Sequence, residues 1–415
     1  MKVFCFTISD KPPHKPHYEQ LPTGWTFASL GDIGNWQAGG TPNRQNSAYY
    51  NGNIPWLKTG DLNDGYIRNI PESITELGLS ESSAKLNSVG SVLIAMYGAT
   101  IGKLGILEFP AATNQACCAC LVFDEVDSKY LFYFLMEYRD KFIESGIGGA
   151  QPNISKEIIV QTTIPLPPLA EQHRIVATIE ATFTLIDKIE QDKTDLLEAI
   201  NATKSRILTL AISGKLVPQD PSDEPASVLL GDVVCCDSSH YGGLPRGWVE
   251  TTLGELGTTN IGLTYKPDNI SHTGVAVLRS NNVQNGKISY DNLVYVTSEV
   301  PKKSLAEKGD ILICARNGSR ALVGKSAIIE RDGMAFGAFM AIYRSKCNPY
   351  IQLFLASQAF RQQLDRANTS TVNQITQNML KQIIVPLPPL NEQQRIVAVV
   401  EVVYKKLDDI IAAIS

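Results

Sequence analysis

The strongest constraint on this chain is an eleven-residue stretch that it contains twice. Residues 166–176 read LPPLAEQHRIV and residues 387–397 read LPPLNEQQRIV, identical at nine of eleven positions and offset by 221 residues. The paired prolines cannot continue a helix but suit its entrance, and a glutamate follows in the first turn, where the helix dipole favours an anion. Each copy therefore predicts a helix that begins directly after a proline-rich strand.

Apolar residues then recur at heptad-like spacing in both copies. The first set is Ile175, Val176, Ile179, Phe183, Ile186 and Ile189, and the second set, at the same offset, is Ile396, Val397, Val400, Tyr404, Leu407 and Ile410. A sustained apolar seam requires a partner helix, and the simplest arrangement is that the two helices pair with each other. We assign helix pairing or partner docking to Ile175, Ile179, Phe183, Ile186, Ile396, Val400, Tyr404 and Leu407.

The repeat extends over most of the chain. LPTGW at 21–25 matches LPRGW at 244–248, and residues 89–103 match residues 308–325. A period this long indicates a duplicated domain, because solenoid repeats are far shorter. We expect an N-terminal extension (1–20), a first globular domain (21–165), a central helical spacer (166–217), a linker (218–243), a second globular domain (244–385) and a C-terminal helical spacer (386–415).

Each globular domain is predicted to be a mixed α+β domain. In the first, the apolar runs 91–97, 101–107 and 116–123 indicate buried strands, and residues 129–144 form an amphipathic helical pattern that is mirrored at 349–364. A continuous helix from 169 to 212 would be about 66 Å long. The second copy reaches residue 415, equivalent to 194, so we expect it to supply half of this arm.

Charge and composition indicate which domain is basic and in which compartment the protein is expected. The net charge of −5 divides into −5 over residues 21–165, −6 over 166–243 and +6 over 244–385, so the second domain is basic. Apolar runs are too short for a membrane span, and the N-terminus lacks the apolar core of a signal peptide, which predicts a cytoplasmic protein. The eight cysteines form no disulfide framework.

Motifs for catalysis or metal binding are weak. Cys117, Cys118 and Cys120 contain a CxxC pattern without a suitable second ligand pair, and the five histidines have no ligand spacing. The glycine loops 98–103 and 318–326 miss the spacing of a phosphate-binding loop by one residue each. No tetrad of the kind that holds a flipped base is present. We therefore predict no catalytic residue, no cofactor and no metal in this chain.

Loop side chains suited to reading base edges or gripping phosphate fall at equivalent places in both domains. In the first domain they are Thr41, Arg44, Lys58, Thr59, Tyr97, Thr100, Lys103, Asn114, Gln115, Gln151, Asn153 and Ser155. In the second they are Arg279, Ser280, Asn281, Asn282, Arg316, Asn317, Ser319, Arg320, Asn373 and Gln374. The pattern predicts DNA binding by both domains.

Several stretches together resemble the specificity subunit of type I restriction–modification systems. They are GGTP with the following NGNIPWLKTGDL, SVLIAMYGATIGKLGIL, NQA at 114–116, QPNIS at 151–155 and the duplicated LPPLxEQxRIV. The resemblance covers residues 21–415 and implies two target recognition domains, each reading one half of a split DNA sequence. Long paired antiparallel helices, with an internal pseudo-two-fold repeat, would separate them.

The same resemblance implies partners. They are double-stranded DNA, two methyltransferase subunits docked on the helices, and restriction subunits in the full complex, with no membrane. S-adenosylmethionine, ATP and Mg are then expected on the partner subunits. The residues alone leave two alternatives open, a stand-alone DNA-modifying enzyme and an assembly scaffold whose globular domains do not touch DNA.

Overall fold

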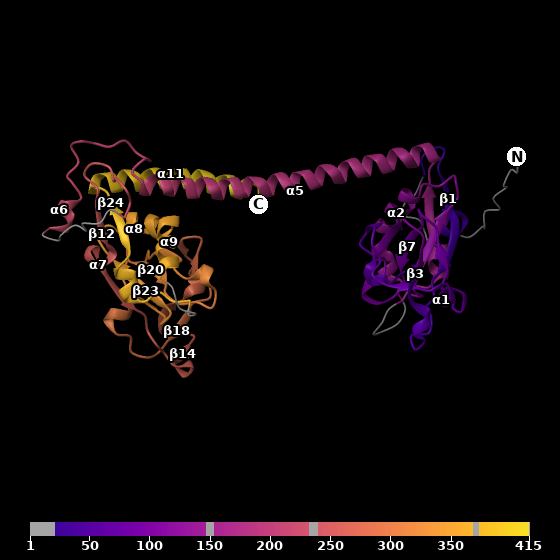
Figure 1. The fold of residues 1–415 in the computed structure, drawn as a ribbon, viewed down its shortest axis with the longest axis horizontal. Helices are drawn as coiled ribbons and strands as arrows, with labels where there is room; N and C mark the ends of the chain where they lie inside the picture. Colours follow the sequence, from indigo (N-terminus) through magenta and orange to yellow (C-terminus); the bar gives the residue numbers. More distant parts are fainter. Residues whose placement is uncertain (1–20, 147–152, 232–239, 368–372, 415) are drawn as a thin grey trace. The chain divides into compact units, whose positions relative to one another are not determined.

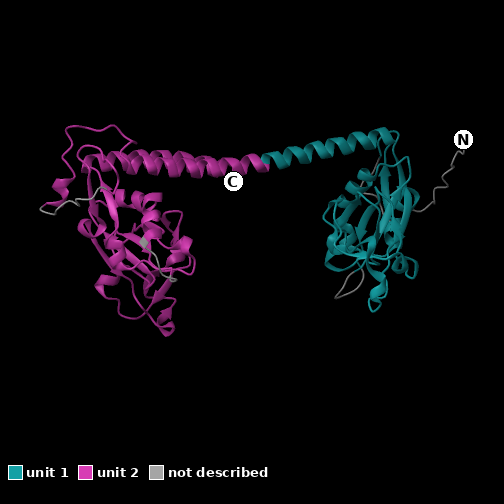
Figure 2. Cartoon of the chain, in the orientation of Figure 1, with its two compact units in different colours: residues 1–189 teal, residues 190–415 magenta. Residues whose placement is uncertain are grey.

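The computed structural model describes residues 21–146, 153–231, 240–367 and 373–414. The chain divides into two compact units, residues 1–189 and 190–415 (Figure 2). The boundary falls inside a single helix, α5 (Leu169–Ile212), which begins where the duplicated prolines predicted it and has the predicted extent. No helix in the described part of the chain is both long and apolar enough to span a membrane.

Unit 1 contains two mixed sheets. The larger has the strand order β2 (Gly34–Ala38), β10 (Cys117–Val122), β7 (Val92–Ala95), β8 (Leu104–Leu107), β4 (Gly65–Ile67). The smaller has the order β5 (Ser73–Ile74), β3 (Tyr50–Leu57), β9 (Ala111–Thr113), β6 (Leu86–Asn87). The helices are α1 (Glu76–Ser80), α2 (Ser128–Glu137), α3 (Arg139–Glu144) and α4 (Lys156–Gln161).

Unit 2 repeats this plan with one strand fewer in the first sheet and one more in the second. One sheet has the order β13 (Thr258–Ile261), β23 (Met340–Arg344), β20 (Ile311–Cys314), β21 (Ser326–Ile328). The other has the order β14 (Ile270–Ser271), β18 (Val294–Val296), β15 (Val275–Leu278), β22 (Met334–Phe336), β19 (Leu305–Ala306), and β16 (Val283–Gln284) pairs with β17 (Lys287–Ile288). The helices are α6 (Ser227–Leu230), α7 (Leu253–Leu256), α8 (Asn348–Leu355), α9 (Gln358–Ala367), α10 (Gln377–Lys381) and α11 (Leu390–Ile414).

The proline-rich strand closes each globular domain. In unit 1, β11 (Thr163–Leu166) pairs antiparallel with β1 (Thr26–Ser29), and in unit 2, β24 (Ile384–Leu387) pairs with β12 (Val249–Thr252). The entering and leaving strands of each domain are therefore neighbours, and the long helix starts next to the point where the chain enters. The duplicated sequence thus corresponds to a duplicated structural junction.

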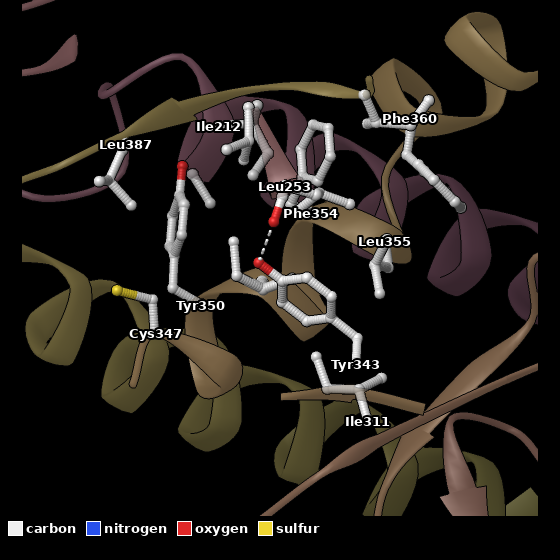
Figure 3. Close-up of a cluster of buried hydrophobic side chains, with 14 of the residues drawn as sticks. Ile212, Leu253, Ile311, Tyr343, Cys347, Tyr350, Phe354, Leu355, Phe360 and Leu387 are labelled. Carbon is white, nitrogen blue, oxygen red and sulfur yellow. Dashed lines mark hydrogen bonds between the residues drawn. The ribbon is translucent and has the colours of Figure 1, made fainter. Parts of the chain in front are cut away.

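The core of unit 2 shows how that junction is held (Figure 3). Tyr343, Tyr350 and Phe354 are buried together with Ile212 from α5 and Leu387 from β24. The hydroxyl of Tyr343 donates to the carbonyl of Leu253 at 2.9 Å, which satisfies the polar end of a buried ring. In unit 1, the start of α5 is anchored in the same way, because Val176 is buried in the domain core.

The two helices pair within unit 2, but α11 packs on a later part of α5 and not on the predicted seam of residues 175–189. There α11 lies along residues 200–212 of α5 (Figure 1), with Ile200, Leu208, Ile396 and Val400 buried. Lys204 contacts Tyr404 and Asp408, whereas Gln219, just beyond α5, contacts Glu392 at the start of α11. The pairing is therefore antiparallel. The first apolar set has two different surroundings in unit 1. Ile175 packs on the domain core, whereas Phe183 and Ile186 are exposed.

Two predicted helices are each broken into two. The segment 129–144 forms α2 and α3, and 349–364 forms α8 and α9. At the second break, the hydroxyl of Ser357 donates to the carbonyl of Phe354 at 2.6 Å and accepts the N–H of Phe360 at 3.4 Å. Such local bonding competes with helix propagation and caps a new helix. The helix is therefore interrupted at a point where the amphipathic sequence pattern continues.

Buried thiols account for the CxxC pattern. Cys117, Cys118 and Cys120 lie in β10 and are all buried. Burial raises the pKa of Cys118 to about 12, and it raises the pKa of Cys117 and Cys120 as well. These side chains are neutral core residues at ordinary pH, and they behave as small hydrophobes.

Candidate nucleic-acid interface

A row of backbone hydrogen bonds joins four segments of unit 1 that are far apart in the sequence. The bonds run from N–H to carbonyl as Asn114 to Leu57 (2.9 Å), Met96 to Ala116 (2.8 Å) and Ile154 to Met96 (2.9 Å). They bring together predicted interface residues that are far apart in sequence, namely Lys58, Gln115, Tyr97 and Asn153. Tyr97 and Asn153 also form an isolated β-bridge. We call residues 57–58, 96–97, 114–116 and 153–154 the rim of unit 1.

The same row of bonds recurs in unit 2. It runs as Gly337 to Leu278 (2.9 Å), Ala315 and Arg316 to Phe339 (2.9 and 3.0 Å) and Ile375 to Ala315 (2.7 Å). Arg316 and Gln374 form the isolated bridge that corresponds to the bridge between Tyr97 and Asn153. We call residues 278–279, 315–316, 337–339 and 374–375 the rim of unit 2. The backbone is thus conserved between the two halves of the chain while the side chains that it presents differ.

The GGTP turn lies against the rim of unit 1, and its glycines are required there. A Cβ on Gly39 would come within 2.2 Å of the carbonyl oxygen of Thr113, and one on Gly40 within 2.3 Å of the backbone at Ser83 and Ala84. Gly40 donates its N–H to Thr113 at 2.8 Å, and Thr41 is hydrogen-bonded to Gln115. This close approach fixes two predicted interface residues, Thr41 and Gln115, next to each other.

Two of the predicted cations are already paired. Arg44 and Lys58 both form ion pairs with Glu72, and the Arg44 guanidinium lies over the rings of Trp56 and Tyr50 at 4.9 and 5.0 Å. Because Lys58 donates to its carboxylate, the pKa of Glu72 is lowered below its ordinary value. Both cations are therefore positioned but partly neutralised. Sequence reasoning missed Glu72, since no local pattern connects it to the two cations.

Other predicted residues of unit 1 have structural roles or lie elsewhere. Ser155 caps α4 by accepting the N–H of Ile158 at 3.3 Å, and the hydroxyl of Thr100 donates to the carbonyl of Tyr97 at 2.9 Å. Thr59 begins the 3-10 turn Thr59–Asp61 and is half-buried, whereas Lys103 is exposed. Asn114 has a buried Oδ1 with no hydrogen-bond partner in the described part of the chain. Gln151 lies outside the described residues.

In unit 2, several predicted residues form one loop network. Asn317 donates to the hydroxyl of Ser280 at 3.4 Å and accepts the N–H of Ser319 at 3.0 Å, and Asn373 donates to the carbonyl of Gly318 at 3.0 Å. The guanidinium of Arg316 lies over the ring of Phe339 at 5.4 Å. Phe339 is exposed and was not among the predicted interface residues, because an apolar side chain carries no hydrogen-bonding signal.

The remaining predicted residues of unit 2 are less available. Asn282 is buried, and its amide donates to the carbonyls of Ser289 and Asp291, so it holds its own loop together. Arg320 pairs with Asp365 at 2.9 Å. Arg279 donates to the carbonyl of Asn292 at 3.4 Å, and its buried Nε has no partner among the described residues. Asn281 is exposed next to Asn282.

Nothing in the described ranges provides the ligand set of a metal centre, because no three His, Cys, Asp or Glu side chains are grouped to hold an ion. Amide, hydroxyl and guanidinium groups at the rims can pair with base edges, and flanking cations can contact phosphates.

The family model and the similar proteins all point to one family. The family model for the type I restriction modification DNA specificity domain matches residues 22–199 and 245–415. The EcoAI specificity subunit of Escherichia coli is 24% identical over 367 residues, covering 69% of this chain and 60% of that protein. The MjaVIII specificity subunit of Methanocaldococcus jannaschii is 24% identical over 390 residues, covering 91% and 85%. This chain spans about 60% of the length of the EcoAI protein and 64% of the EcoBI one.

Solved structures share the fold. The HsdS subunit from Thermoanaerobacter tengcongensis superposes with a TM-score of 0.62 at 21% identity, covering 95% of this chain and 93% of that one. A chain from a study of complex assembly and conformational transition in the type I R-M system superposes with a TM-score of 0.66, also at 21% identity, covering 96% and 94%.

Proposed function

This chain belongs to the type I restriction modification DNA specificity family, and from that premise we propose that it reads a two-part DNA sequence for a methyltransferase complex. The observation that carries the proposal is the pair of matching rims. Each globular domain presents different polar side chains on one conserved backbone. Two domains with the same backbone arrangement and different side chains can recognise two different half-sites.

Each rim then contacts one half of the target. Arg316, Gln374 and Asn373 in unit 2, and Gln115 and Asn153 in unit 1, carry groups that pair with base edges in the major groove. Among the flanking cations, Lys103 is exposed and suits a phosphate contact, whereas Lys58 and Arg279 would first have to leave Glu72 and the Asn292 carbonyl. Phosphate contacts set affinity and make it fall with salt. The chemistry stays with partner subunits, since specificity subunits of this family are non-catalytic.

The partners that this function requires are double-stranded DNA, two methyltransferase subunits and, in the full complex, restriction subunits. S-adenosylmethionine, ATP and Mg would be bound by those subunits. The long helix offers a docking surface, because Phe183, Ile186 and Ile189 form an exposed apolar face on the unit 1 part of α5. An exposed row of large apolar side chains on one helix face favours a protein contact.

The experiment that tests the proposal exchanges residues 244–385 for the corresponding domain of a relative. The chimera is expressed with its methyltransferase subunits, and the methylated sequence is read by single-molecule sequencing. The expected result is that one half of the methylated sequence changes and the other half stays the same. A methylation pattern unaffected by the exchange contradicts DNA reading by this domain and favours the scaffold alternative.

A further inference from the structure

Phe339 is an apolar side chain on a polar rim. It lies in the turn between β22 and β23, its carbonyl accepts the N–H groups of Ala315 and Arg316, and its side chain is 59% exposed. The fold does not need an aromatic ring here, because the equivalent residue of unit 1, at the same hydrogen-bonded position, is Ala116. A fixed backbone that presents an exposed ring indicates that the ring itself has a use.

Arg316 is the neighbour that shows what this use is. Its guanidinium lies over the Phe339 ring at 5.4 Å, and its backbone is held from both sides, by Phe339 and by the bridge to Gln374. Within the described ranges, no carboxylate lies within ion-pairing distance of it. This cation–π contact restricts the position of the guanidinium, whose N–H edge matches O6 and N7 of guanine.

We propose that Phe339 reads the 5-methyl group of a thymine that adjoins the guanine bound by Arg316. This inference rests on the proposed DNA-reading function and names the bases read by one rim. Apolar contact, including contact by Phe, is how side chains recognise the thymine methyl in the major groove. Adjacent bases are separated by about 3.4 Å along the strand, and the Arg316 guanidinium lies 5.4 Å from the centre of the Phe339 ring. The two flexible side chains can therefore reach two successive bases.

The first test removes only the methyl group. The full chain with its methyltransferase subunits is titrated, at one fixed salt concentration, with duplexes of its own target in which each thymine of the second half-site is replaced in turn by deoxyuridine. One replacement, next to a guanine, is expected to weaken binding about fourfold, the cost of exposing one buried methyl group. The other replacements should change binding by less than about twofold.

The second test removes the ring. In Phe339→Ala the uracil penalty at that thymine should disappear, whereas Phe123→Ala, an exposed ring outside both rims, should retain it. Arg316→Lys should weaken discrimination at the neighbouring guanine, because an ammonium lacks the bidentate geometry.

The outcomes separate the two proposals. Failure to bind any specific duplex contradicts the DNA-reading function itself. Specific binding with no uracil penalty in the second half-site, or a half-site without a thymine next to a guanine, overturns the role of Phe339 alone. Because the base-replacement test uses the unaltered protein, it is decisive even if a variant fails to fold.

Discussion

The hydroxyl of Tyr404 in α11 donates to the backbone carbonyl of Lys204 in α5 at 2.9 Å, and the Lys204 ammonium lies over the Tyr404 ring at 5.4 Å while pairing with Asp408. One tyrosine therefore binds the backbone of the opposite helix and also contacts its cation. Tyr404 corresponds to Phe183 of the first copy, which has no hydroxyl and is 45% exposed. Equivalent positions in the repeat thus have different surroundings in the two units.

This contact predicts an alkaline loss of stability. Burial raises the pKa of Tyr404 to about 12 from an ordinary value of 10, so the folded state retains the phenol proton more tightly than the unfolded state. The stabilisation is complete below pH 10 and is lost as pH rises toward 12. Tyr404→Phe should cost about 1 kcal/mol at pH 8 and lose less stability than the wild type between pH 10 and 12, as measured by urea unfolding. Parallel pH profiles would contradict the assignment.

The GGTP turn predicts a difference between two glycines. Gly39→Ala places a Cβ 2.2 Å from the Thr113 carbonyl oxygen, and backbone at that distance cannot yield without moving the turn. Unit 1 should lose about 2–3 kcal/mol of unfolding free energy. Gly60→Ala is the matched control, since nothing lies within 4 Å of its Cβ; it should change stability by less than about 0.5 kcal/mol. Equal effects in thermal unfolding would show that the close approach does not constrain the turn.

Releasing the paired cations should strengthen DNA binding. Glu72→Gln removes the carboxylate that holds Arg44 and Lys58. If the freed cations contact phosphates, affinity at low salt should rise, and the slope of log affinity against log salt should become more negative by about 0.9 for each added contact. Glu108→Gln is the control, since Glu108 pairs with Arg68 at the end of β8 away from the rim. A Glu72 variant with the slope of the control would place both cations outside the interface.

The apolar face of α5 should matter more for assembly than for folding. Phe183→Glu with Ile186→Glu is expected to abolish co-purification of a co-expressed methyltransferase subunit, because two buried charges would be left unpaired at the contact. Thr184→Glu is the control, since Thr184 is exposed and, at about 100° per residue, lies on the opposite side of the helix from this face. Because the Phe183 ring lies 6.0 Å from the Tyr133 ring, the double variant should lose at most about 1.5 kcal/mol of unfolding free energy and remain folded. Retention of the subunit by the double variant would exclude this face as its docking surface.

Interactions within a few residues of sequence were predictable. The two helix starts follow from the rigid φ of proline and the anion preference of a first turn, and α5 and α11 begin at Leu169 and Leu390, directly after the prolines. The duplication predicted two domains of one plan, and the strands near 92–95, 104–107 and 117–122 lie inside the predicted apolar runs. The breaks at Tyr138 and Ser357 were missed, because the amphipathic pattern continues through them.

By itself the sequence determined that this chain is a duplication, where its helices begin and which loops carry polar side chains, because these properties depend on local conformation and on repetition. Only the tertiary structure decided that Glu72 pairs with Arg44 and Lys58, that Asn282 is buried and that Phe339 lies under Arg316. Each of these depends on contacts between segments far apart in the chain. A side chain's burial and charge partner are fixed by packing, and no local pattern records them.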